Sequence, residues 1–165
     1  MLNVRHRRAV KVLLYAITLI IIYLLQTFVF AEIRLLCVKP LLIPLAVVGV
    51  AIFEGSMAGG VFGIFAGMLF DISYSQPLIE YTILFTLLGI VIGLLSDYVL
   101  SRRFPSYLLC CVIVLIIIAA VQVLGMALFS DAEMSDLIDV AWKQTVYSII
   151  FILPLYFPVK AIGRI

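Results

Sequence analysis

Residues 55–71 read GSMAGGVFGIFAGMLFD, an apolar segment in which glycine recurs at every fourth position and an aspartate closes the series. Each step of four turns a helix about 40° beyond a full revolution, so these positions form one slowly winding stripe. Glycine costs about 1 kcal/mol relative to alanine inside a helix, and aspartate is expensive in hydrocarbon. The pattern therefore predicts a helix with a smooth face for close contact, made of Gly55, Gly59, Gly63, Gly67 and Asp71.

The next apolar segment repeats this pattern. Gly89, Gly93 and Asp97 are again four apart, and the spacing G-I-x-x-G-x-L-x-D is common to residues 63–71 and 89–97. Small residues let helix backbones approach closely in lipid, where packing drives association, so each stripe is interpreted as a contact face. General small-residue packing is the simpler interpretation of the same glycines. The match also hints at an internal inverted repeat.

Both aspartates lie where an apolar run ends. Each can cap the following segment at the membrane interface or make a polar contact with a partner. Because consecutive helices run in opposite directions, Asp71 is expected near the outer membrane surface and Asp97 near the inner one. The two carboxylates are therefore not expected to form one catalytic pair.

The composition indicates that lipid surrounds most of the chain. Of 165 residues, 66% are hydrophobic and only 12% are charged, whereas an ordinary soluble domain is about half apolar and a quarter charged. A water-soluble protein of this length could not bury so much apolar surface. The sequence predicts an all-α integral membrane protein that forms a single domain.

Six apolar runs divide the chain, and we interpret them as six transmembrane helices with both termini in the cytoplasm. The second and third are short, and the second spans a membrane only if residues 35–38 extend it. The predicted spans are residues 12–30, 35–53, 57–70, 81–97, 107–129 and 141–159.

The distribution of charge supports this count. With the N-terminus inside, eight of the 11 Lys and Arg residues lie in cytoplasmic segments, as the positive-inside rule requires. Joining residues 41–70 into one helix would place Arg102 and Arg103 outside, so five spans are rejected. A re-entrant hairpin over 41–70 preserves the same topology and stays open as an alternative. The basic N-terminus is interpreted as a topology signal that also contacts anionic lipid.

No arrangement of residues points to catalysis. His6 is the only histidine, which excludes general acid–base histidine and the HExxH zinc motif. Cys37, Cys110 and Cys111 lack metal-site or disulfide spacing and are interpreted as apolar fillers. Glu54, at a predicted turn, is the one acid that could serve a proton-coupled transporter, and only within a re-entrant hairpin. No enzyme activity, cofactor, metal or nucleic-acid partner is expected.

Residues 55–98 resemble the bacterial rod shape-determining protein MreD family. The shared features are a glycine-rich helix, Gly67-x-Leu69-x-Asp71, a short polar loop with Pro77-Leu78, and a helix with Gly89 and Gly93. Total length, a basic N-terminus and about six spans also suit that family. Ser75-Gln76 replaces the usual glycine before the proline, and Ile79 replaces a small residue after Pro-Leu, which leaves the loop conformation open.

The resemblance implies a non-enzymatic scaffold of the cell-elongation machinery in the bacterial cytoplasmic membrane. It implies MreC as a partner, acting alongside MreB filaments, the glycosyltransferase RodA and the elongation penicillin-binding protein in peptidoglycan synthesis. The residues expected to matter, for structure and interaction, are the two stripes together with Pro77.

The family's fold resembles the substrate-binding S subunits of energy-coupling-factor transporters, which supplies the alternative function. An S subunit would bind a vitamin or a metal and often carries AxxxA in its first helix. Here Ala9 and Ala16 are seven apart, and the external loops contain few polar or aromatic groups.

Overall fold

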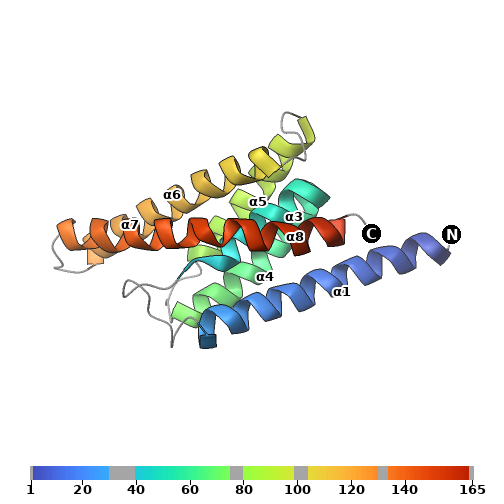
Figure 1. Ribbon diagram of the computed structural model, residues 1–165, viewed down its shortest axis with the longest axis horizontal. Helices are drawn as coiled ribbons and strands as arrows, with labels where there is room; N and C mark the ends of the chain where they lie inside the picture. The colour runs from blue at the N-terminus through green and yellow to red at the C-terminus, as the bar shows by residue number, and fades with distance from the viewer. Residues whose placement is uncertain (1, 30–39, 75–79, 99–103, 130–133, 164–165) are drawn as a thin grey trace.

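The computed structural model describes residues 2–29, 40–74, 80–98, 104–129 and 134–163, and these fold almost wholly into helices (Figure 1). No strand occurs in these ranges. The elements are α1 (Leu2–Leu24), the π-helical η1 (Leu25–Val29), α3 (Leu42–Glu54), α4 (Ser56–Tyr74), α5 (Glu80–Tyr98), α6 (Phe104–Phe129), α7 (Met134–Ile150) and α8 (Ile152–Gly163).

Within the residues that the structure describes, four helices are long and apolar enough to cross a membrane. They lie within Val10–Phe28, Ser56–Ser73, Glu80–Tyr98 and Phe104–Met126, and the bent pair α7–α8 makes a fifth if it counts as one span. The chain is therefore an all-α protein of the multi-pass membrane type. The second predicted span, residues 35–53, corresponds to α3, whose 13 residues cover only about 20 Å at 1.5 Å per residue.

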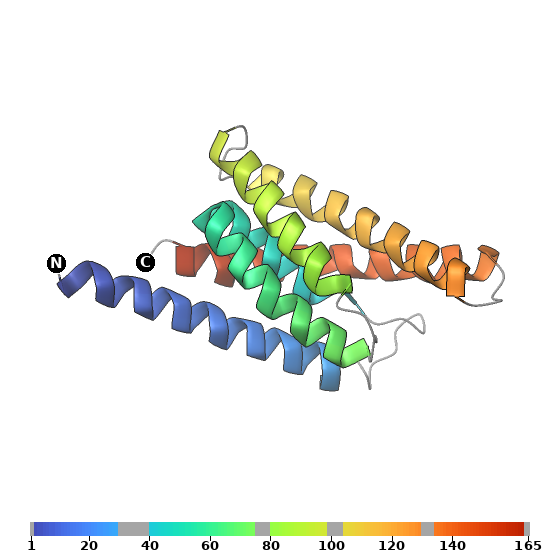
Figure 2. The ribbon, with the colours of Figure 1, turned by 180° about the vertical axis from the view of Figure 1, so that it is seen from behind.

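Helix α3 lies at the centre of the bundle. Every residue from Leu42 to Ile52 is buried, and α3 packs against α1, α4, α5, α6 and α8. Figures 1 and 2 show α8 on one side of it and α4 with α5 on the other. A helix that is apolar all round fits this position, because no face needs to meet water.

A single glycine reverses the chain between α3 and α4. Gly55 has φ = 89° and its N–H donates to the carbonyl of Ala51 at 3.1 Å. This left-handed conformation is accessible to glycine without a Cβ penalty, and it satisfies a carbonyl at the end of α3. The tight turn expected at residues 54–56 is therefore present, and Gly55 has a backbone role in addition to its place in the stripe.

The helix boundaries differ from the predicted loops in two places. Helix α4 continues to Tyr74, so Asp71 lies one turn inside the helix rather than in a loop. Helix α7 begins at Met134, within the segment that separates the predicted spans 107–129 and 141–159. In both places polar residues suggested a loop although the helix continues.

The last predicted span is not one straight helix. Helices α7 and α8 meet at Phe151 with a bend of 50°. Pro154 has no N–H to donate to the carbonyl of Ile150, and its ring crowds the preceding turn, which breaks the helical ladder. At the break, the backbone N–H of Phe151 donates to the carbonyl of Ser148, three residues earlier rather than four, at 3.1 Å.

Candidate functional site

The contact between α4 and α5 is built on backbone rather than on side chains. The two helices lie side by side (Figure 2) and form the most extensive helix pair of the described chain. A Cβ added at Gly63 would lie 2.5 Å from the carbonyl oxygen of Phe85, and one at Gly59 would lie 2.7 Å from that of Gly89. Real Cβ atoms essentially never approach a neighbour below 3.0 Å, so no larger residue fits without moving a helix.

The same contact runs the length of both helices in antiparallel register. Added Cβ atoms at Gly67 and Gly93 would meet the backbones of Thr82 and Ser56 at less than 3.0 Å. Backbones this close exclude lipid and gain dispersion contacts along the whole pair, which is how small residues hold membrane helices together.

Asp71 joins α4 to the beginning of α5. Its side chain is buried, and its Oδ1 accepts the backbone N–H of Tyr81 at 3.2 Å. Its Oδ2 accepts the backbone N–H of Thr82 at 3.0 Å and the Thr82 hydroxyl at 2.6 Å. The first N–H groups of a helix have no partner within it, and a carboxylate also complements the positive end of the helix dipole. Asp71 is thus the N-terminal cap of α5, supplied from the neighbouring helix.

Asp97 lies at the other end of this helix pair. Its carboxylate oxygens are 3.4 Å from the position a Cβ of Gly55 would occupy, so they border the α3–α4 turn. Unlike Asp71, Asp97 is exposed. The two aspartates lie at opposite ends of the pair and share no site. Pro77, the remaining predicted residue, lies outside the described residues.

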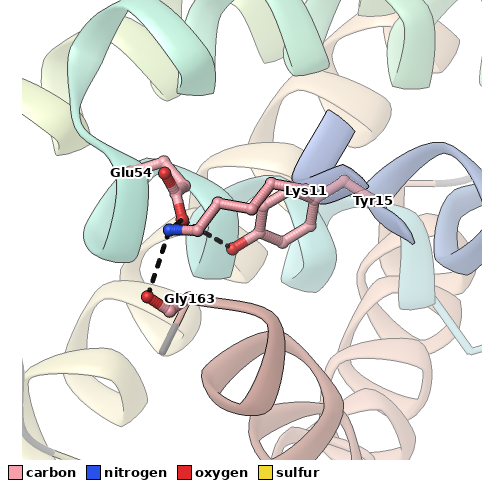
Figure 3. A network of polar contacts seen from close by, with 4 residues as sticks. All are labelled: Lys11, Tyr15, Glu54 and Gly163. Atoms are coloured by element: carbon pink, nitrogen blue, oxygen red, sulfur yellow. Dashed lines mark hydrogen bonds and ion pairs between the residues drawn. The ribbon is translucent and has the colours of Figure 1, made fainter. Parts of the chain in front are cut away.

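A second polar cluster joins three helices near both chain ends (Figure 3). Lys11 Nζ lies 2.9 Å from Glu54 Oε1 and donates to the carbonyl oxygen of Gly163 at 3.3 Å. The Tyr15 hydroxyl donates to the same Glu54 oxygen at 3.2 Å. Lys11 and Glu54 are each about one-fifth exposed, at 23% and 22%. Lys11 thereby neutralises the carboxylate and meets a carbonyl at the negative end of α8.

Two buried polar side chains cap the N-terminal end of α3. Gln26 Oε1 accepts the backbone N–H groups of Leu42 and Ile43 at 3.1 and 3.2 Å. The Ser148 hydroxyl oxygen accepts the N–H of Leu41 at 2.8 Å. At the opposite end, the Ser96 hydroxyl donates to the carbonyl of Ile52 at 2.9 Å. A helix end inside a membrane protein has no water to bond, so side chains of other helices satisfy it.

Sequence reasoning missed these last two clusters. It recognised Lys11 only as part of the basic terminus and Glu54 as an acid at a turn. Gln26 is a polar residue within the first predicted span, yet its partner 16 residues away could not be inferred from spacing. The available signal was the isolation of each polar group in an apolar run, because such groups need a partner.

The described residues contain no group of three or more His, Cys, Asp or Glu side chains placed to hold a metal ion. Cys110 and Cys111 are buried and not disulfide-bonded, and Cys37 lies outside the described residues. The polar side chains discussed above bind helix ends and one another.

These features define a class: a multi-pass helical membrane protein whose polar side chains serve helix–helix contact. A comparison with protein-family models then assigns the family. The model described as rod shape-determining protein MreD matches residues 6–164, and the chain belongs to this family. Its members are shape-determining structural proteins of the bacterial inner membrane, and the family is not a known enzyme family.

Neither the curated proteins nor the solved structures compared with this chain gave a match. The likeness to transporter S subunits therefore stays a prediction of fold. The family match covers nearly the whole chain and points to MreD. The alternative function as a transporter S subunit is not supported.

Proposed function

We propose that this protein is a non-enzymatic scaffold of the cell-elongation machinery that binds MreC and links the shape complex to peptidoglycan synthesis. The observation that carries the proposal is the MreD family match over residues 6–164. The family belongs to the MreBCD shape complex, so a role in rod shape determination follows from membership. Binding of MreC, and contact with RodA and the elongation penicillin-binding protein, are the finer parts of the proposal.

The geometry suits a scaffold. Helices α4 and α5 touch through their backbones, and Asp71 closes one end of the pair. Ends of the buried helix α3 are capped by side chains from other helices. A bundle fixed in this way presents its outward surfaces in a defined arrangement, which lowers the ordering cost of binding a partner helix.

The proposed topology retains six crossings, with α3 as a short buried one and both termini in the cytoplasm. The contact between Lys11 and the carbonyl of Gly163 is consistent with this topology, because it puts the start of α1 and the end of α8 on the same side of the membrane. Figure 1 also shows the N and C ends at the same end of the bundle. Single-cysteine labelling in a cysteine-free background, at Arg102 inside and Asp131 outside, tests this arrangement.

Co-purification in a gentle detergent tests the proposed partner. An affinity-tagged chain co-expressed with MreC should retain MreC, and an equally hydrophobic single-span protein should wash away. Retention of ATP-binding-cassette subunits or of a vitamin, without MreC, would contradict the scaffold proposal and restore the transporter alternative.

A further inference from the structure

The outward face of α8 carries two prolines one helical turn apart. Pro154 and Pro158 are exposed, and Ile150, four residues earlier, is 66% exposed. Positions four apart share one face of a helix. The opposite face of α8 is buried in the core through Ile152, Leu155, Tyr156, Val159 and Ile162.

These prolines remove two hydrogen bonds on the exposed face. In an α-helix the carbonyl of residue i accepts the N–H of residue i+4, and proline has no N–H. The carbonyls of Ile150 and Pro154 therefore lose their helical donors. The break is local, because the next carbonyl, that of Phe151, accepts the N–H of Leu155 at 3.2 Å.

The freed carbonyls lie deep in the membrane under the proposed topology. Lys160 marks the cytoplasmic end of α8, and Ile150 is ten residues from it, or about 15 Å at 1.5 Å per residue. That distance is about half of a hydrocarbon core roughly 30 Å thick. A carbonyl without a donor costs several kcal/mol there, and neighbouring helices normally satisfy such groups at proline breaks.

The neighbours of α8 lie on its other side. Helix α8 lies in front of α3 in Figure 1, and its exposed residues lie on the side opposite to its buried ones. Among the described residues, no turn or side-chain hydrogen bond reaches the carbonyl of Ile150, so a donor from another protein would satisfy it. Lipid tails carry none.

A second copy of the chain does not supply them through the same face. The face consists of Ile150 at the end of α7 and of Leu153, Pro154, Phe157, Pro158 and Ala161 in α8, and none of these residues has a side-chain donor. A two-fold interface would bring this face against itself and leave the carbonyls facing carbonyls. The partial negative charge of these oxygens instead fits the hydroxyl or carboxamide groups that join membrane helices.

We propose that the outward face of α8 binds a transmembrane helix of a different protein, whose hydroxyl or carboxamide side chains donate to the carbonyls of Ile150 and Pro154. The inference rests on the proposed function, since the helix belongs to the partner MreC. It adds the surface and the chemistry of that contact.

Site-specific photo-crosslinking in cells that co-express MreC tests the proposal. A benzophenone amino acid replaces Phe157, which is 64% exposed on α8, or Ile83, which is 69% exposed on α5 and serves as the matched control. Each experiment is repeated with Pro154→Ala and Pro158→Ala together, which restore both backbone donors. Pro105→Ala is the proline control, because Pro105 lies in the first turn of α6, where its N–H would have no partner within the helix. Retention of MreC by the tagged chain is measured in parallel.

The expected result is an MreC adduct from position 157 and none from position 83. The adduct should fall about fivefold or more in the double proline variant, the factor for one lost hydrogen bond of about 1 kcal/mol. Pro105→Ala should leave it unchanged. Two results would overturn the inference while MreC is still retained, which leaves the proposed function standing. One is an MreC adduct from position 83, and the other is an adduct from position 157 that the proline changes do not reduce. A dimer adduct or lipid adducts alone from position 157 also overturn it, and loss of MreC retention in the wild type overturns both.

Discussion

Thr82 meets Asp71 twice: its hydroxyl donates to Asp71 Oδ2 at 2.6 Å, and its backbone N–H donates to the same oxygen at 3.0 Å. The threonine lies in the first turn of α5 and the aspartate in the last turns of α4. One side chain therefore caps a helix and fixes its position against the neighbour. This double role explains, in structural terms, why an aspartate follows the glycines of α4.

Replacing Asp71 with alanine should destabilise the protein by about 2–3 kcal/mol, because it leaves buried helix N–H groups without an acceptor. The measurement is the free energy of unfolding from denaturation in mixed detergent–SDS micelles. Asp139→Ala is the control, since the Asp139 side chain is 60% exposed and pairs with Lys143. Its effect should stay below about 0.5 kcal/mol. Equal midpoints for the two variants would refute the cap.

A methyl group should be tolerated at one glycine and not at another. A Cβ at Gly67 would meet the backbone of Thr82, whereas a Cβ at Gly125 would meet no described atom within 4 Å beyond its chain neighbours and its own helix backbone. Gly67→Ala should therefore lower the unfolding free energy, and Gly125→Ala should raise it by about 0.5–1 kcal/mol through helix propensity. Circular dichroism during thermal unfolding distinguishes them. The reverse order of melting temperatures would show that α4 and α5 are not in backbone contact.

Lys11 and Glu54 should be energetically coupled. A double-mutant cycle with Lys11→Ala and Glu54→Ala is expected to give an interaction energy of about 1 kcal/mol or more, within the range for partly buried contacts. The exposed i,i+4 pair Asp139–Lys143 provides the control cycle and should give about 0.3–0.5 kcal/mol. If both cycles return the same coupling, the cluster at the chain ends contributes no more than a surface pair.

Gln26 should protect the start of α3. In Gln26→Leu the backbone N–H groups of Leu42 and Ile43 lose their acceptor, and hydrogen–deuterium exchange in that segment should accelerate. Thr18→Ala is the control, because the Thr18 hydroxyl donates to the carbonyl of Leu14 in its own helix. Unchanged protection of residues 41–43 in Gln26→Leu would mean that the glutamine is not the cap.

A contact face on each of α4 and α5 could be predicted from the sequence, because glycine spacing is a local pattern that reports one helix face; that the two faces meet each other is a finding of the structure. The family could be inferred from the same residues, and the family match confirms it. The proposed importance of these residues for function stays a prediction.

Other features depend on contacts between distant segments. The burial of α3 on every side could not be distinguished from a short membrane span by hydropathy, since both are apolar runs. The partners of Gln26 and Lys11 lie 16 and 43 residues away, and spacing carries no information about them. Pro154 was visible in the sequence, but the break at Phe151 follows only once residues 134–163 are known to be helical on both sides of it.

Cell shape gives the most direct test of the claim that close α4–α5 contact is required for function. The chain replaces the resident MreD of a rod-shaped bacterium as wild type, as Gly67→Leu or as Gly125→Leu, with membrane levels checked by immunoblotting. The account predicts rods with wild type and Gly125→Leu, and rounded cells with Gly67→Leu at equal membrane levels. Rods of normal width with Gly67→Leu would contradict it.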